Sequence, residues 1–387
     1  MSAKQQLTRF HSILSEAVKA AQPKSRRRSA EKAQRTAEKT QRLQEESTII
    51  IDWNKDFNMS VDKKMKEFVE KMYKIETETK LSTHFLNNLM NMASNNQKYT
   101  KYMETQQKNR NPDVFCLETT RVKLKGGTDG QDYIHANYIT VEKAKKAYIA
   151  TQHPMASTIE DFWNMVVNEE IELIVSLTNL VGPDFPSYFP TRRNSFTEYG
   201  SYQIICKNNR QTSLKYSPQV LTLEIVQEGC ANGWSVILLK YPHWAKGSVP
   251  TSPKVVMTLM RMMSKVFKFA PIVIHCETGV NQSAVLIYTD LIYNLLLDNQ
   301  TVDIDEIFQS IRKQRVSMLS QRIHFVYSIY VVLEFIKIRF IHNKTMPEVV
   351  KMIETMEKTL EPEFSKFISP EPSEPKYSSP GPSDLMY

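Results

Sequence analysis

The stretch that decides the fold is Val273-Ile274-His275-Cys276-Glu277-Thr278-Gly279-Val280-Asn281-Gln282-Ser283. The β-branched residues at its start predict a buried strand, and the apolar run over 284–297 is long enough for a helix. A cysteine between a strand end and a helix start lies where backbone N–H groups and the helix dipole favour an anion, either its own thiolate or a bound phosphate. The stretch therefore has the layout of a loop that cradles phosphate beside a nucleophile.

Gln282 is the unusual residue of this loop. It lies six positions after Cys276, in the expected first turn of the helix, and should face the same concavity. An arginine at that position would offer a planar fork of charged donors that matches two phosphate oxygens, whereas Gln282 offers one neutral amide. The loop keeps the nucleophile and lacks the cation.

The spacing His-Cys-x5-Gln-Ser resembles the signature loop His-Cys-x5-Arg-Ser/Thr of the protein tyrosine phosphatases. Further blocks resemble that family in the same order and at similar separations: Lys108-Asn109-Arg110 with Asp113-Val114, then 132–139, 148–154, 161–166, 244–250 and 311–315. They extend over 58–344. The resemblance implies an α/β (α+β) fold of the protein-tyrosine-phosphatase type, with a twisted mixed central β-sheet flanked by helices on both sides.

The departures from the family fall on its working residues. In active members the cysteine attacks phosphorus, the arginine holds the equatorial oxygens, and an aspartate in the Trp-Pro-Asp loop protonates the leaving phenolate. By resemblance Cys276 keeps the nucleophile position, Gln282 replaces the arginine and Lys246 replaces the aspartate. A lysine, with a reference pKa of about 10.4, releases a proton reluctantly.

The loss of catalytic rate can be estimated from the usual contribution of each missing group. General acid catalysis is worth roughly 10² to 10⁴-fold and one preorganised oxyanion donor roughly 10² to 10³-fold, although such effects are not additive. The chain is therefore identified as a degenerate member of the family, a pseudophosphatase rather than an enzyme.

Other positions also depart from the family pattern. Asn111 stands where a tyrosine would stack on the substrate ring, and His153 and Asn281 stand at glycine positions. The segment after Arg315 is shorter than the family's, and no glutamine falls cleanly at its water-positioning place, although Gln321 lies near it.

The loop's backbone donors and helix dipole survive any change of side chain, so an anion site is still expected. The candidate residues for binding phosphate or peptide are Lys108, Arg110, Asp113, Glu277, Thr278, Gly279, Val280, Asn281, Ser283 and Gln321. The predicted partner is a phosphotyrosine-containing or acidic protein, a kinase among the candidates, which the chain would bind or scaffold.

Simpler interpretations stay open for the same residues. Cys276 is also compatible with a small buried hydrophobic residue. Lys108 and Arg110 are compatible with a solvated basic cluster, and Lys246 with either surface charge or a cation over the pocket mouth. Two functional alternatives also stay open: a low-activity phosphatase that works through a Cys276 phosphoenzyme, and an interaction protein that works through its tails with a vestigial pocket.

Composition fits one large domain with segments left over: 387 residues, 41% apolar and 24% charged. Four cysteines without a Cys-x-x-Cys pair suggest neither a zinc site nor a disulfide framework, and we expect no cofactor. The first thirty residues lack the apolar core of a signal peptide, and no apolar run reaches the roughly 18 residues of a membrane span. We expect a cytoplasmic protein, with nuclear entry open through its basic N-terminal run, and no nucleic-acid partner.

The expected organisation has four parts. Residues 1–57 form a basic, partly helical or disordered extension, since 1–46 hold eleven Lys/Arg and five Glu. The phosphatase-like domain over 58–344 precedes an amphipathic helix over 345–360 and a Pro/Ser-rich disordered tail over 361–387. In that tail Ser369-Pro370 and Ser379-Pro380 resemble proline-directed phosphorylation sites. Periodicity predicts helices over 65–75, 85–92, 253–269 and 303–314, and strands over 171–177, 201–206, 220–226 and 234–239.

Overall fold

The computed structural model describes residues 59–90, 98–126, 131–178, 182–210, 217–230, 232–266 and 270–369. The predictions for 1–57 lie outside these residues, as does most of the expected tail.

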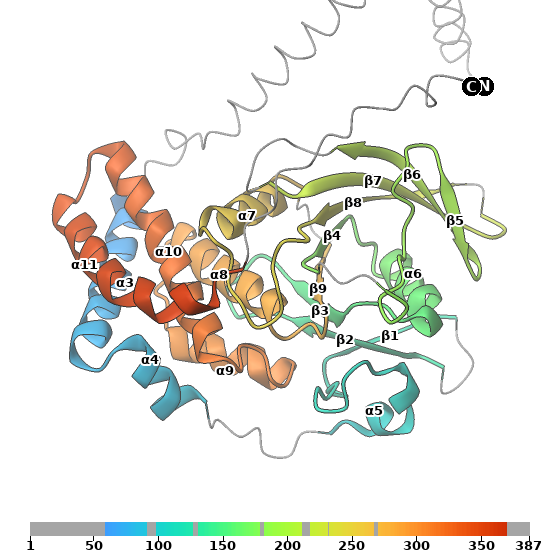
Figure 1. Cartoon of the computed structure of the whole chain (residues 1–387), viewed down its shortest axis with the longest axis horizontal. Coiled ribbons are helices and arrows are strands. Elements are labelled where there is room, and N and C mark those ends of the chain that lie inside the picture. The colour runs from blue at the N-terminus through green and yellow to red at the C-terminus, as the bar shows by residue number, and fades with distance from the viewer. Residues whose placement is uncertain are drawn as a thin grey trace, which may run out of the picture. The chain divides into compact units, whose positions relative to one another are not determined.

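The described residues contain a nine-stranded mixed sheet in the order β1-β2-β3-β9-β4-β8-β7-β6-β5 (Figure 1). Its strands are β1 (Arg121–Lys123), β2 (Tyr133–Ile139), β3 (Tyr148–Gln152), β4 (Leu173–Ser176), β5 (Phe196–Tyr199), β6 (Tyr202–Arg210), β7 (Gln219–Gln227), β8 (Trp234–Lys240) and β9 (Ile272–Cys276). The four predicted strands are confirmed as β4, β6, β7 and β8, with ends shifted by a few residues.

The centre of the sheet is parallel, and this positions the site. β9 pairs in parallel with β3 on one side and β4 on the other, and β4 pairs in parallel with β8. All five residues of β9 are buried, as expected of a parallel strand covered on both faces. The last residues of β3 and β9, Gln152 and Cys276, are register partners. Because the two strands are parallel, the loops that follow them lie together at one edge of the sheet.

Helices cover both faces of the sheet, as the resemblance implied. They are α3 (Met59–Glu78), α4 (Leu81–His84), α5 (Thr100–Glu104), α6 (Ile159–Asn168), α7 (Lys254–Val266), α8 (Gln282–Leu297), α9 (Ile304–Gln314), α10 (Arg322–Asn343) and α11 (Pro347–Phe364). Figure 1 shows α8, α9 and α10 gathered with α3, α4 and α11 on one side, and α6 on the other. Residues of α6, including Phe162 and Trp163, join the core cluster beneath β4, β7 and β8.

Four short helical segments complete the described chain: η2 (Phe85–Leu89), η3 (Gln106–Lys108), η4 (Ala156–Thr158) and η5 (Ser365–Phe367). The segment η2 is a single π-turn, and it replaces most of the α-helix predicted over 85–92. The rest of that prediction, beyond Met90, lies outside the described residues.

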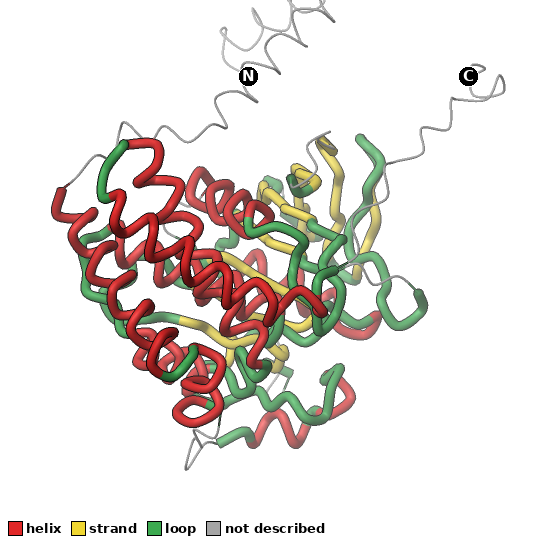
Figure 2. The backbone as a smooth tube through the Cα atoms, turned by 60° about the vertical axis from the view of Figure 1, so that its left-hand side comes forward, coloured by secondary structure: helices red, strands yellow, loops and turns green. Residues whose placement is uncertain are grey.

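The C-terminal helix is longer than predicted. α11 runs to Phe364 with Pro362 inside its last turn, and η5 follows directly, so residues 361–367 of the expected disordered tail are helical. The apolar stripe of α11, which includes Ile353, is buried, and α11 packs against α10 and α3 in the group of helices that comes forward in Figure 2. This stripe supplies the burial that extends the helix past a residue as unfavourable as proline.

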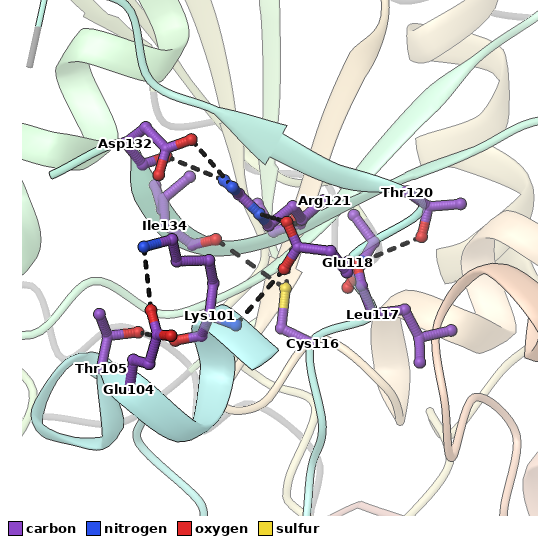
Figure 3. A network of polar contacts seen from close by, with 12 residues as sticks. Lys101, Glu104, Thr105, Cys116, Leu117, Glu118, Thr120, Arg121, Asp132 and Ile134 are labelled. Atoms are coloured by element: carbon purple, nitrogen blue, oxygen red, sulfur yellow. Dashed lines mark hydrogen bonds and ion pairs between the residues drawn. The ribbon is translucent and has the colours of Figure 1, made fainter. Parts of the chain in front are cut away.

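A polar network lies at the β1 edge of the sheet (Figure 3). The Arg121 guanidinium pairs with Glu118 and Asp132, both at 2.8 Å, and joins the chain before β1 to the start of β2. Behind it, the buried Cys116 thiol contacts the carbonyl oxygens of Ile134 and Ala136. Burial raises the pKa of the Cys116 thiol, so this cysteine is a packed side chain and not a reactive one.

Within the residues that the structure describes, no helix has the length and apolar character to cross a membrane.

Candidate functional site

The loop between β9 and α8 has the cradle geometry that its sequence predicts. Gly279 has a φ of +73°, and a Cβ there would lie 2.3 Å from the Thr151 carbonyl oxygen, so only glycine fits. The Gly279 N–H donates to the Cys276 sulfur at 3.2 Å. Helix α8 starts directly after Asn281, so its first N–H groups and its positive dipole end face the loop. Cys276 therefore lies between a strand end and a helix start, with the Gly279 N–H directed at its sulfur.

Arg315 holds this loop from behind, a role that its sequence position did not reveal. Its guanidinium is fully buried and donates to the carbonyl oxygens of Thr278 at 2.8 Å and Gly279 at 3.0 Å. It also donates to Asn137 Oδ1 at 2.7 Å. Because the C=O and N–H of one trans peptide point in opposite directions, the N–H groups of Gly279 and Val280 face away from Arg315, toward the cradle.

Gln282 does not face an open concavity. Its side chain is buried, and its amide donates to the carbonyl oxygens of Trp244 at 3.4 Å and Ala245 at 3.3 Å. Both acceptors belong to residues 244–250, which we call the Trp244 loop and which stand where the family has its acid loop. The residue that replaces the signature arginine therefore links the cradle to the Trp244 loop.

Lys246 and Glu277 pair across the mouth of the site. The Lys246 ammonium lies 2.9 Å from a Glu277 carboxylate oxygen, with the lysine side chain 62% exposed and the glutamate 19%. The lysine at the acid position is thus neutralised by the residue that follows the nucleophile. Both interpretations of Lys246 stay open, since its ammonium is largely exposed and is paired with Glu277.

The basic segment is also engaged. Lys108 forms an ion pair with Asp161 at 2.9 Å. Arg110 donates to the carbonyl oxygens of His153, Pro154 and Asp184, and its guanidinium carbon lies 4.4 Å from the centre of the Phe185 ring.

Asn111, which cannot stack on a substrate ring, forms a local turn. Its side-chain oxygen accepts from the Asp113 N–H at 2.8 Å, and the Asp113 side chain is exposed. The departure from tyrosine is therefore accommodated by a local side-chain-to-backbone hydrogen bond.

Two histidines sit in the aromatic cluster beneath the cradle. His275 Nε2 is 2.6 Å from the Tyr188 hydroxyl, and His153 packs against both rings. Burial holds the pKa of His275 well below its ordinary value and lowers the pKa of His153 to about 4. Both are neutral at physiological pH, so neither contributes positive charge to the site.

The other candidate residues divide into two groups. Thr278, Val280 and Ser283 are buried in the cradle, while Asn281 is half-buried at its rim. Gln321 is exposed, immediately before α10, and no contact in the described residues brings its side chain to Cys276.

Beside the cradle lies a cavity of about 540 Å³ whose lining includes Asn109, Arg110, Ser157, Phe185 and Glu277. Cys276 itself is fully buried, so the thiol is closed off from this space in the present arrangement. The described side chains hold no cluster of three or more His, Cys, Asp or Glu that could bind a metal ion. What the site retains is a sulfur at a helix N-terminus with backbone donors around it.

Comparison with known proteins agrees with this geometry. The family model described as protein-tyrosine phosphatase matches residues 105–334. Receptor-type tyrosine-protein phosphatase zeta of Rattus norvegicus is 31% identical over 243 residues, which cover 59% of this chain and 10% of that protein. Tyrosine-protein phosphatase non-receptor type 20 of the same species is 27% identical over 240 residues, 61% of this chain and 56% of that protein. Tyrosine-protein phosphatase 69D of Drosophila melanogaster is 30% identical over 221 residues, 54% of this chain and 15% of that protein.

The chain belongs to the protein-tyrosine phosphatase family. The match spans little more than half the length of the non-receptor relative and a much smaller part of the two others.

Proposed function

We propose that this chain is a catalytically inactive protein-tyrosine phosphatase that recognises a phosphotyrosine-containing or acidic protein. The observation that carries the proposal is the place of Gln282, whose neutral amide donates to Trp244 and Ala245 where the reaction needs a guanidinium on the phosphoryl oxygens. Lys246 supports it, since an ammonium paired with Glu277 cannot replace a carboxyl proton donor.

In this proposal, phosphate binding relies on the backbone groups of the cradle, which the residues Gln282 and Lys246 leave unchanged. The backbone N–H groups of the cradle and the N-terminus of α8 still favour an anion. An incoming phosphate would have to displace Glu277 from Lys246, after which the freed ammonium becomes a ligand for the phosphate. The kinase among the candidate partners and the cytoplasmic or nuclear location stay predictions from the sequence.

The catalytic half of the proposal is tested with purified protein and para-nitrophenyl phosphate, a generic aryl phosphate. We expect no turnover above that of the Cys276→Ser variant. Turnover that disappears with Cys276→Ser would instead establish the alternative, a low-activity phosphatase, which the Gly279 N–H contact to the sulfur favours.

Restoring the lost groups gives the sharper experiment. The double variant Gln282→Arg, Lys246→Asp should gain at least about 10²-fold in turnover, because it returns the charged fork and the general acid. The new carboxyl would lie beside that of Glu277, which favours its protonated, proton-donating form. Each single variant serves as a control.

The binding half is tested by fluorescence anisotropy with a phosphotyrosine peptide and its unphosphorylated twin. We expect affinity for the phosphorylated form alone, raised by Glu277→Ala because the competing carboxylate is gone. Equal affinity for both peptides, or none for either, would contradict a pocket-based function and favour one carried by the tails.

A further inference from the structure

A short C-terminal segment is bound to the Trp244 loop. Residues 367–369, which we call the C-terminal strap, start at the last residue of η5 and pair in parallel with Val249 through Ile368. The Val249 N–H donates to the Phe367 carbonyl and the Ser369 N–H donates to the Val249 carbonyl, both at 2.8 Å. A segment more than a hundred residues away in sequence therefore adds backbone hydrogen bonds to the loop, as an added strand does.

The Ser369 hydroxyl makes the closest contacts of the strap. Its oxygen accepts from the Ala245 N–H at 3.0 Å and is hydrogen-bonded to the Ser248 hydroxyl. The Ser248 hydroxyl donates its own hydrogen to the Ala245 carbonyl at 2.7 Å, so Ser369 must be the donor between the two serines. Ser369 is 2% exposed, so its neutral hydroxyl lies in a buried site.

The strap binds a residue of the Trp244 loop that also contacts the cradle. Ala245 receives Ser369 at its N–H and Gln282 at its carbonyl. The next residue, Lys246, pairs with Glu277 beside the fully buried Cys276. The strap therefore holds the part of the Trp244 loop that contacts Gln282 and Glu277 of the cradle.

Hydrogen bonds rather than apolar burial hold the strap in place. Its two large side chains are only partly covered, with Phe367 43% and Ile368 41% exposed. The strap follows α11, whose own apolar stripe is buried against α10 and α3. Release of the strap would break the four hydrogen bonds described above, and we therefore expect it to open locally, as elements of low stability do.

We propose that Ser369 is a phosphorylation site for a proline-directed serine/threonine kinase, and that its modification unlatches the Trp244 loop and exposes Cys276. The kinase would act on the released strap, where Ser369 precedes Pro370. The Ser369 hydroxyl oxygen attacks the γ-phosphorus of ATP, its proton passes to the kinase's base, and ADP leaves with the electrons of the broken phosphoanhydride bond.

The phosphorylated serine cannot return to its site. It carries a charge of about −1.5 to −2 and has lost the hydroxyl hydrogen that Ser248 accepts. Phosphorylation would thus convert an infrequent opening of the strap into the predominant state. This inference concerns access to the pocket, and it stands whether or not the pocket binds phosphotyrosine.

The test measures how fast iodoacetamide alkylates Cys276, resolved by peptide mass spectrometry in the full chain. The protein is compared before and after treatment with ATP and a purified proline-directed kinase, and as the Ser369→Glu and Ser369→Ala variants. We expect the Cys276 rate to rise about tenfold in the phosphorylated and Ser369→Glu proteins, since at least two hydrogen bonds are lost. Ser369→Ala, which removes the hydroxyl without adding bulk or charge, should give a smaller increase.

Ser379 provides the matched control because it has the same Ser-Pro dipeptide and lies outside the described residues. Ser379→Glu should leave the Cys276 rate unchanged. Circular dichroism of each variant separates loop opening from loss of the fold. The proposal is overturned if the kinase modifies Ser379 and spares Ser369, or if stoichiometric phosphate on Ser369 leaves the Cys276 rate as it was.

Discussion

At the scale of single residues, Gln282 shows how one change of side chain alters what a loop does. An arginine at this position would direct charged donors at a bound anion, whereas the glutamine amide donates to two loop carbonyls. Both distances, 3.3 and 3.4 Å, are long for a hydrogen bond, so each contact is weak. The Trp244 loop therefore depends on its other partners: Glu277, Ser369 and the His324 ring, whose Nε2 lies 3.1 Å from the Ser248 carbonyl.

Gly279 and Gly247 allow a prediction about the cradle. Both have positive φ, +73° and +71°, but only at Gly279 does an added Cβ meet backbone, while at Gly247 it meets open space. We expect Gly247→Ala to lower the free energy of unfolding by about 1–2 kcal/mol, the cost of left-handed backbone for an L-residue. Gly279→Ala should cost about 3 kcal/mol or more, because the clash with Thr151 is added. Urea denaturation of the two variants checks this, and equal losses would mean that the cradle relaxes freely.

At the scale of elements, the sequence predicts those structures that depend on local pattern. The β-branched run before Cys276 and the apolar stripe of α11 became β9 and a packed helix, because burial follows their periodicity. The position of Gln282 relative to Cys276 was also predictable, since a helix start fixes it.

Contacts between distant segments were not predictable in this way. Arg315 reaches Gly279 from 36 positions away and Ser369 reaches Ala245 from 124. Neither contact gives rise to a periodic pattern in the sequence. Arg315 carried one usable signal, a place inside a block that resembles the family's. Ser369 carried none beyond its Ser-Pro dipeptide.

Helix α11 should contribute to the stability of the domain. Ile353 is fully buried in its stripe, while the adjacent Glu354 is exposed. Ile353→Ala should lower the free energy of unfolding by about 2–5 kcal/mol, the usual cost of removing a large buried aliphatic side chain. Glu354→Ala should leave it within about 0.5 kcal/mol of the parent. Chemical denaturation measures the free energy of unfolding of both variants, and we expect a single unfolding transition for each. A separate early transition in the Ile353→Ala variant would show that α11 unfolds independently.

At the scale of the whole molecule, buried neutral histidines are spread across the fold. Burial lowers the pKa of His135 to about 3, and those of His153 and His324 to about 4. His275 is shifted in the same direction. In the unfolded chain each histidine binds a proton near pH 6.5, so below that pH the unfolded state holds more protons than the native one.

Stability should therefore fall as the pH drops from about 6.5 toward 4, by up to about 1.4 kcal/mol per pH unit for each of these histidines. Above pH 7 the same groups are neutral in both states and contribute no slope. Thermal unfolding between pH 4.5 and 8 measures the effect. His324→Gln keeps a donor for the Ser248 carbonyl and removes one titrating group, so its curve should be shallower. An unchanged slope would contradict the assignment for His324.

The strap has a consequence for any protein that binds the end of the chain. Because Ser369 is hydrogen-bonded to Ala245, the 18 residues of 370–387 are attached beside the Trp244 loop. Even fully extended they reach at most about 65 Å, so a ligand held by the tail stays tethered close to Cys276. Such tethering raises the local concentration of the ligand at the cradle without any new contact. If the cradle binds an anion as proposed, a ligand that also binds residues 370–387 would be held by both contacts with higher avidity than by either alone.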